Sequence, residues 1–308
     1  MEHSQHMLQD KVVVVTGSGR GIGRSIALSM AQQGARVVVN DVGAARDGEG
    51  QDASPAQEVV DEIVRQGGQA IANTQSVADW DSAQAIIAQA LDTWGRIDCV
   101  VNNAGILRDR MFHNMSPEDF DAVIKVHLYG AFYMSRAAVV PMRQQKSGAL
   151  IQMSSSTGLI GNIGQANYAA AKLGIVALSK SIALDCGRSG IRSNVVSPSG
   201  WTRMTSGMPT ETPEQQAIAQ KMQAVMQPEK VAPLIACLAS DAASAVNGQI
   251  FSVRGNEIFL YGHTRPIRSM HRGDGWTPQT VASQILPAFL PSFTPLQTIQ
   301  DVFSWDPV

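Results

Sequence analysis

The segment that most constrains the fold is VVVVTGSGRGIGRSIA, at residues 12–27. Its four valines indicate a buried strand, because strands of a parallel sheet that is covered on both faces read as continuous apolar runs. Gly17, Gly21 and Gly23 then lie between this strand and a stretch of helical character. Glycines at such a junction let the backbone turn tightly and approach a pyrophosphate, which meets the N–H groups and the dipole of the helix start. The segment therefore predicts a dinucleotide-binding βα unit, against the alternative that the glycines only pack a turn.

The rest of the chain repeats this alternation of strand and helix. Seven short runs rich in Val and Ile alternate with longer Ala-, Gln- and Leu-rich stretches, which is typical of βαβ units around a parallel sheet. We expect an α/β fold with a Rossmann-type, doubly wound, seven-stranded parallel sheet in a domain spanning residues 8–255. The expected strands are 11–16, 36–40, 70–73, 97–102, 149–154, 191–196 and 250–253.

Three irregular segments interrupt or follow this pattern. Residues 43–55 are rich in Gly and in charged residues, and we expect a mobile surface insertion there. Residues 198–213 contain Trp201, Met204 and Met208 and lead into a helix with further methionines, which forms either plain core or an adaptable lid. Residues 256–308 hold too many aromatic side chains for a disordered tail. We expect them to be a C-terminal extension that packs on this domain or on a partner subunit.

Charge and cysteine content argue against several classes of function. The 24 Lys and Arg nearly balance the 26 Asp and Glu, so nothing favours nucleic acid or an anionic membrane as partner, and we expect a small-molecule substrate. Cys99, Cys186 and Cys237 form no CxxC pair, so we expect neither a metal site nor disulfides. No apolar run is long enough to span a bilayer, and neither the polar N-terminus nor the ending SWDPV is a targeting signal. We therefore expect a cytoplasmic protein.

Asp41 ends the second expected strand and bears on the choice of cofactor. A carboxylate at this position accepts hydrogen bonds from the adenosine ribose hydroxyls and repels a 2′-phosphate, which favours NAD over NADP. Arg20 in the glycine loop is a contrary signal, because its guanidinium could hold that phosphate. The fixed negative charge at the ribose should dominate, so we predict NAD as the cofactor. Asp41 could alternatively serve only as a helix or turn cap.

Tyr168 and Lys172 are four residues apart in an Ala-rich stretch of helical character, so they share one helix face. An unperturbed Tyr has a pKa of about 10, and a nearby ammonium together with the positive nicotinamide of an oxidised cofactor could lower it by about three units. Tyr168 would then be the general base in oxidation and the general acid in reduction. Ser155, where the fifth strand ends, can hydrogen-bond the substrate oxygen as its charge changes. The alternative is a surface helix with a solvated lysine.

Four motifs together resemble the short-chain dehydrogenase/reductase superfamily over residues 8–255: TGSGRGIG (16–23), NNAG (102–105), SSSTGLIGNIGQANYAAAK (154–172) and the segment 228–253. The resemblance implies that Ser155, Tyr168 and Lys172 are catalytic and that Lys172 also holds the nicotinamide ribose. It implies that residues 103–105 line the adenosine side and that Ser76 and Val77 form the adenine edge. The full set of implied cofactor contacts is Gly17, Arg20, Gly21, Ile22, Gly23, Asp41, Ser76, Val77, Asn103, Ala104, Gly105, Tyr168, Lys172 and Thr202.

Two positions depart from the family pattern. His127, in KVHLYG, stands where many members have an asparagine that completes a proton-relay tetrad. It could be an ordinary helix residue, and we leave it outside the primary catalytic set. Pro198-Ser199 replaces the usual Pro-Gly after the sixth strand, and the hydroxyl expected to hold the nicotinamide amide is that of Thr202.

A finer resemblance is to the branch that includes the dehydrogenase domain of peroxisomal multifunctional enzyme type 2, over segments such as GRIDCVVNNAGILRDR and GNIGQANYAAAKLG. It implies NAD-dependent oxidation of (3R)-3-hydroxyacyl-CoA to 3-ketoacyl-CoA, on an acyl-CoA or a steroid-like substrate, by a homodimer or homotetramer. Three alternatives stay open. They are a 17β-hydroxysteroid or other alcohol dehydrogenase, a 3-ketoacyl-carrier-protein reductase, and a non-catalytic nucleotide-sensing scaffold on the same fold.

Overall fold

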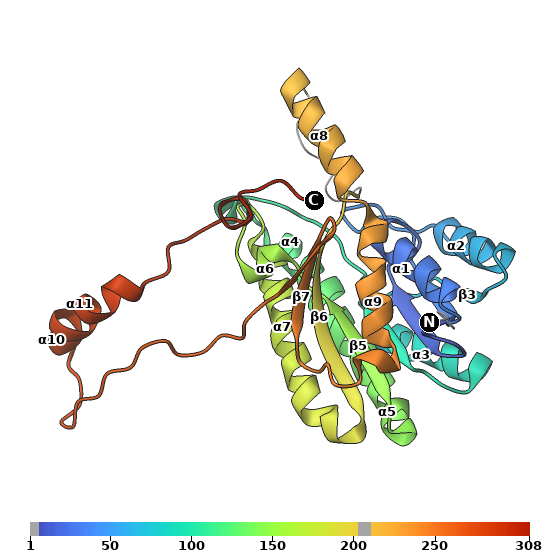
Figure 1. Cartoon of the computed structure of the whole chain (residues 1–308), viewed down its shortest axis with the longest axis horizontal. Coiled ribbons are helices and arrows are strands. Elements are labelled where there is room, and N and C mark those ends of the chain that lie inside the picture. The colour runs from blue at the N-terminus through green and yellow to red at the C-terminus, as the bar shows by residue number, and fades with distance from the viewer. Residues whose placement is uncertain (1–5, 203–210) are drawn as a thin grey trace, which may run out of the picture.

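The computed structural model describes residues 6–202 and 211–308, which form one mostly parallel sheet flanked by helices (Figure 1). The strand order is β3-β2-β1-β4-β5-β6-β7-β8. The seven parallel strands of the predicted doubly wound α/β fold are confirmed. Their bounds are β1 Val12–Thr16, β2 Arg36–Asn40, β3 Gln69–Asn73, β4 Cys99–Asn102, β5 Gly148–Met153, β6 Ile191–Ser199 and β7 Ile250–Arg254.

An eighth strand, β8 (Glu257–Leu260), was not predicted. It pairs antiparallel with β7 in a hairpin whose turn begins at Gly255, which has a φ of +61°. Two-residue hairpin turns with glycine first match the twist of the strands on either side. The sheet therefore continues past residue 255, where we expected the domain to end. We had interpreted the turn residues Gly255-Asn256 as the start of a tail.

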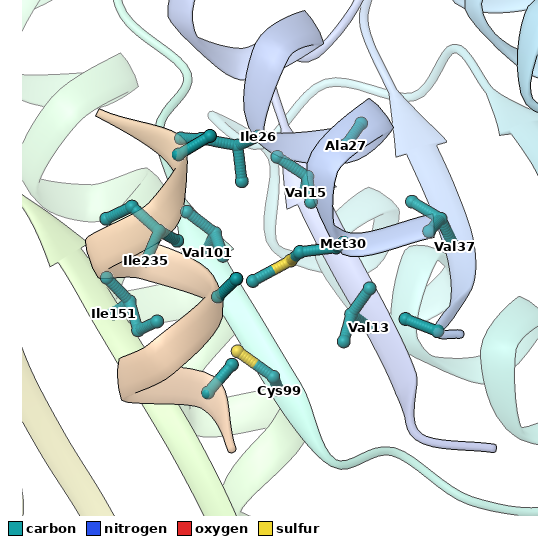
Figure 2. Packing of buried hydrophobic residues seen from close by; sticks show 14 of the residues in the cluster. Val13, Val15, Ile26, Ala27, Met30, Val37, Cys99, Val101, Ile151 and Ile235 are labelled. Atoms are coloured by element: carbon teal, nitrogen blue, oxygen red, sulfur yellow. The ribbon is translucent and has the colours of Figure 1, made fainter. Parts of the chain in front are cut away.

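Helices cover both faces of the sheet, as the doubly wound topology requires. One face carries α1 (Gly21–Gln32), α2 (Ser54–Arg65) and α9 (Ala232–Ala239), and the other carries α3 (Trp80–Trp94), α5 (Gly130–Gln145) and α7 (Ala166–Cys186). Val13 and Val15 of β1 point to the first face and pack on Met30 of α1, as Figure 2 shows, whereas Val12 and Val14 point to the second face. This two-sided burial explains the unbroken valine run.

The chain reverses its direction across the sheet between β1 and β4. From β1 the sequence moves outward through β2 and β3, and then returns to place β4 on the other side of β1. Loops that follow parallel strands diverge at such a switch point and leave a crevice beyond the carboxyl ends of the strands. The segments that follow the neighbouring parallel strands β1, β4, β5 and β6 lie at this edge of the sheet, and they carry most of the predicted site residues.

Several further helices complete the fold. They are α4 (Pro117–Ile124), α6 (Ser156–Leu159), α8 (Pro213–Val225), α10 (Pro278–Thr280), α11 (Leu286–Phe289) and α12 (Ile299–Val302). A π-helical turn at Lys125–Tyr129 joins α4 to α5. Helix α8 and an arm that carries α10 and α11 project away from the body (Figure 1). Within the described residues, no helix combines the length and the apolar character needed to cross a bilayer.

Candidate active site

Ser155, Tyr168 and Lys172 lie together at the end of β5. Ser155 is the N-cap of α6, and its Oγ accepts a hydrogen bond of 3.1 Å from the backbone N–H of Thr157. Tyr168 and Lys172 project from the first turns of α7, with Lys172 Nζ 5.5 Å from the centroid of the Tyr168 ring. Burial raises the pKa of Tyr168 to about 12, hydrogen bonding with Ser155 opposes this rise, and the charge of Asp109 adds to it. The predicted serine, tyrosine and lysine therefore form one interacting group.

Lys172 is buried, with 3% of its surface exposed, and its Nζ donates a 2.6 Å hydrogen bond to the carbonyl oxygen of Met153 at the end of β5. Burial lowers the pKa of this ammonium to about 7. The ammonium lies over the ring face of Tyr168. Because its pKa is about 7, it readily loses a proton near neutral pH. The expected lowering of the pKa of Tyr168 is not found in the protein alone, because burial of the phenol outweighs the favourable contacts. The other part of that expectation, the positive charge of an oxidised nicotinamide, belongs to the cofactor.

His127, which the sequence interpretation left outside the catalytic set, forms a wall of this site. Its ring meets that of Tyr168 edge to face, with centroids 5.1 Å apart, and its Nε2 lies 2.8 Å from the carbonyl oxygen of Ile106. Burial first and the charge of Lys172 second hold the pKa of the imidazole well below its usual value. A Cβ on Gly105 would lie 2.3 Å from His127 Cε1, so only glycine fits there. Because His127 lies 41 residues before Tyr168 on another helix, spacing alone could not pair them.

The glycine loop after β1 is built for close backbone approach. A Cβ on Gly23 would lie 2.1 Å from the carbonyl oxygen of Gly17, so a side chain at residue 23 would force the loop apart. Asn103 Nδ2 donates to the carbonyl oxygens of Thr16 and Gly17 and fastens the loop after β4 to the glycine loop. The N-cap of α1, Arg20, makes no side-chain capping bond, which leaves the helix N–H groups for an anion. The loop fits the predicted pyrophosphate.

Asp41 lies at the end of β2 beside this loop, as predicted. Its Oδ2 accepts 2.8 Å from the N–H of Gly19, and its Oδ1 accepts 2.7 Å from the N–H of Gly43. Each carboxylate oxygen can accept more than one hydrogen bond, so this fastening leaves capacity for ribose hydroxyls. The carboxylate is held in place by the segments on both sides of it.

The remaining predicted cofactor residues lie around the same crevice. The Thr202 methyl is 3.3 Å from the position a Gly21 Cβ would take, and Ile22 of α1 lies against Gly200. Val77, after β3, is buried against Gly130 of α5. The N–H of Ala104 donates to the Thr16 hydroxyl, and the Ser76 hydroxyl accepts from the N–H of Ala78. Met204 and Met208 lie outside the described residues.

A polar network that the sequence did not reveal joins three segments of the site. Gln165, the N-cap residue of α7, donates from Nε2 to both carboxylate oxygens of Asp109 at 3.2 Å. Its Oε1 accepts 3.1 Å from the hydroxyl of Thr157, whose N–H in turn holds Ser155. The network ties the loop after β4, α6 and α7 together. Gln165 stands only three residues before Tyr168, and this proximity is the one signal that could have pointed to it.

The chain is similar in sequence to known dehydrogenases and reductases. The family described as enoyl-(acyl carrier protein) reductase matches residues 17–255. A short-chain type dehydrogenase/reductase of Mycobacterium tuberculosis is 46% identical over 82% of this chain and 84% of its own length. Peroxisomal multifunctional enzyme type 2 of Mus musculus is 45% identical over 88% of this chain, which spans 35% of that longer protein. A 3-oxoacyl-[acyl-carrier-protein] reductase of Synechocystis sp. is 41% identical over 82% of this chain and 99% of its own length.

Solved structures agree with the fold. A short-chain dehydrogenase from Mycobacterium avium superposes with a TM-score of 0.82 at 39% identity, covering 95% of this chain and 99% of its own. A 7α-hydroxysteroid dehydrogenase, solved with NADH and 7-oxo glycochenodeoxycholic acid, has a TM-score of 0.73 at 31% identity, covering 83% of this chain and 97% of its own.

Proposed function

This chain belongs to the short-chain dehydrogenase/reductase family, and we propose that it is an NAD-dependent dehydrogenase that oxidises (3R)-3-hydroxyacyl-CoA to 3-ketoacyl-CoA. The observation that carries the proposal is the combination of two neighbouring groups. Tyr168, interacting with Ser155 and Lys172, offers proton transfer at the end of β5, and the glycine loop with Asp41 offers a nucleotide site at the end of β1.

The residues at this crevice have distinct tasks in the proposed reaction. Oxidised NAD, when bound, supplies the acceptor for the hydride of the alcohol carbon. Tyr168 removes the hydroxyl proton, and Ser155 hydrogen-bonds the same oxygen as it becomes a carbonyl. Lys172, when protonated, favours the phenolate of Tyr168 that this step needs. His127 packs against the ring of Tyr168 and fixes its position, and Gly105 leaves room for the imidazole.

NAD rather than NADP is supported by Asp41. Its carboxylate is fastened at the end of β2, where a ribose hydroxyl is favoured and a 2′-phosphate is repelled. The related 7α-hydroxysteroid dehydrogenase was solved with NADH. This choice also separates the proposed function from a 3-ketoacyl-carrier-protein reductase, because such reductases usually take NADP.

The CoA thioester as substrate class is supported by the likeness to a hydroxyacyl-CoA dehydrogenase of Mycobacterium tuberculosis, which is 40% identical over 90% of this chain and 88% of its own length. The second candidate is a hydroxysteroid dehydrogenase, and the bile-acid steroid in the 31% identical structure favours it. Initial rates with NAD and NADP against (3R)-hydroxyacyl-CoAs, free hydroxysteroids and simple secondary alcohols separate these functions. We expect turnover of the CoA esters with NAD. Preference for NADP, or activity on free steroids with none on CoA esters, would contradict the proposal.

The proton-transfer role of Tyr168 is tested by Tyr168→Phe. The phenylalanine keeps the ring packing on His127 but has no ionisable group, so we expect turnover to fall by about three orders of magnitude or more while NADH binding is preserved. Stopped-assay turnover and NADH fluorescence titration measure the two quantities. Tyr129→Phe, which removes an exposed hydroxyl on another helix, is the matched control. Unchanged turnover in the Tyr168 variant would contradict the proposed role of Tyr168 in proton transfer.

A further inference from the structure

The insertion at residues 43–53 folds back onto the cofactor end of the molecule. The N–H of Asp52 donates to the carbonyl oxygen of Val42, which closes the insertion into a loop. Gly43, at its start, has a φ of +71°, and a Cβ there would lie 1.8 Å from the carbonyl oxygen of Asp52. The two ends of the insertion are therefore packed in contact, and Asp52 returns to the residue that fastens Asp41.

This closure brings Asp52 to Arg20 of the glycine loop. Arg20 Nη2 lies 3.9 Å from Asp52 Oδ2, and both side chains are partly exposed. Pro55, just after Asp52, lies beside Gly19, since a Cβ on Gly19 would approach it to 2.7 Å. The Asp52 carboxylate is oriented by a 2.9 Å hydrogen bond from the N–H of Ser54 at the start of α2. The carboxylate is thus directed at the one cation of the glycine loop.

Arg20 and Asp41 flank the place where NAD and NADP differ. Asp41 Oδ2 is bonded to the N–H of Gly19, the residue next to Arg20. An arginine in this position accommodates a 2′-phosphate, whereas an acidic residue binds the 2′-hydroxyl. We propose that Asp52 is a second specificity-determining carboxylate, which occupies the guanidinium of Arg20 and so denies it to the 2′-phosphate of NADP. This inference rests on the proposed use of NAD and assigns to the insertion a role in choosing the cofactor.

The test is the ratio of kcat/KM for NADP to kcat/KM for NAD, measured with one alcohol substrate. Asp52→Asn removes the charge but keeps an oxygen that can accept from the N–H of Ser54, so the start of α2 is preserved. Because exposed ion pairs are weak, we expect the ratio to rise about two- to fivefold, and to rise more at low ionic strength than at high. Each variant is its own reference for folding, since both cofactors are tested on one preparation.

Two further variants decide the cause of such a rise. In an Arg20→Gln background, Asp52→Asn should no longer raise the ratio, because its effect acts through the guanidinium. Glu58→Gln makes the same charge change on the exposed side of α2 and should leave the ratio unchanged. A wild type that prefers NAD together with an unchanged ratio in Asp52→Asn would overturn this inference alone, as would a rise that persists without Arg20. A wild type that prefers NADP would overturn the proposed cofactor as well.

Discussion

At the scale of single residues, the buried Lys172 carries a stability cost that its chemistry requires. Its folded-state pKa of about 7 lies below the value of about 10.4 for an unfolded lysine, so between these values the unfolded chain binds the extra proton. The free energy of unfolding therefore rises with pH from 7 towards 10.4. Below pH 7 both states are protonated, and the burial penalty is present in full.

Lys172→Met should remove this penalty while abolishing turnover. We expect the cofactor-free variant to be more stable than wild type at pH 6 by about 2–4 kcal/mol, after allowance for the lost hydrogen bond to Met153, with the difference shrinking as pH approaches 10. Urea denaturation of both proteins at pH 6 and pH 9.5 measures it. A variant that is less stable than wild type at pH 6, or a difference in the free energy of unfolding that does not change with pH, would show that Lys172 is not buried as a destabilised cation.

At the scale of elements, the sequence predicted features formed by neighbouring residues and missed contacts between residues on different elements. The valine run, the glycine loop and the four-residue spacing of Tyr168 and Lys172 each lie within a short stretch of consecutive residues, so the sequence predicted them. His127 and Asp52 reach the site from another helix and through a folded loop, and no local pattern marks such contacts. Gln165 caps the helix that carries Tyr168, but only the tertiary structure shows its bonds to Asp109 and Thr157. Strand β8 was missed because its two-residue turn, which follows the last predicted strand, was interpreted as the start of the tail.

The network centred on Gln165 should act as a positioning device at the junction of α6 and α7. Gln165→Met keeps the side-chain length but removes the bonds to Asp109 and Thr157, so the support of Ser155 is loosened. The variant loses the hydrogen bonds of the Gln165 side chain with Asp109, Thr157 and Asn162, and we expect kcat to fall by about tenfold, with the KM for NAD nearly unchanged because the glycine loop is untouched. Steady-state kinetics on both substrates separate these constants. Gln144→Met, on the exposed side of α5, is the control, and an equal kcat in the two variants would rule the network out.

At the scale of the whole molecule, the C-terminal extension divides into three parts, the first of which is strand β8 of the sheet. Its last residues pack on the domain: Arg254 lies against the rings of both Phe303 and Trp305, and Lys221 of α8 pairs with Asp306. The arm before them, residues 262–296, leaves the body and is braced internally by Arg268, which lies over Phe289. It exposes large apolar side chains, with Leu290 65% and Leu296 fully accessible. An arm that carries several exposed apolar side chains away from the body is a candidate interaction site.

We propose that a second copy of the chain covers this arm, in keeping with the homodimer or homotetramer that the family resemblance implies. Replacing Leu290 and Phe293 together by Glu puts two charges on the apolar side of the arm, so we expect the assembly to shift towards a smaller species at micromolar concentration. Light scattering coupled to size-exclusion chromatography measures the mass. Val64→Glu, at an exposed apolar position of α2, controls for surface charge and should keep the wild-type mass. Because the last residues still fasten to Arg254 in the arm variant, a changed mass would report on the arm, whereas an unchanged oligomer would place the contact between subunits elsewhere.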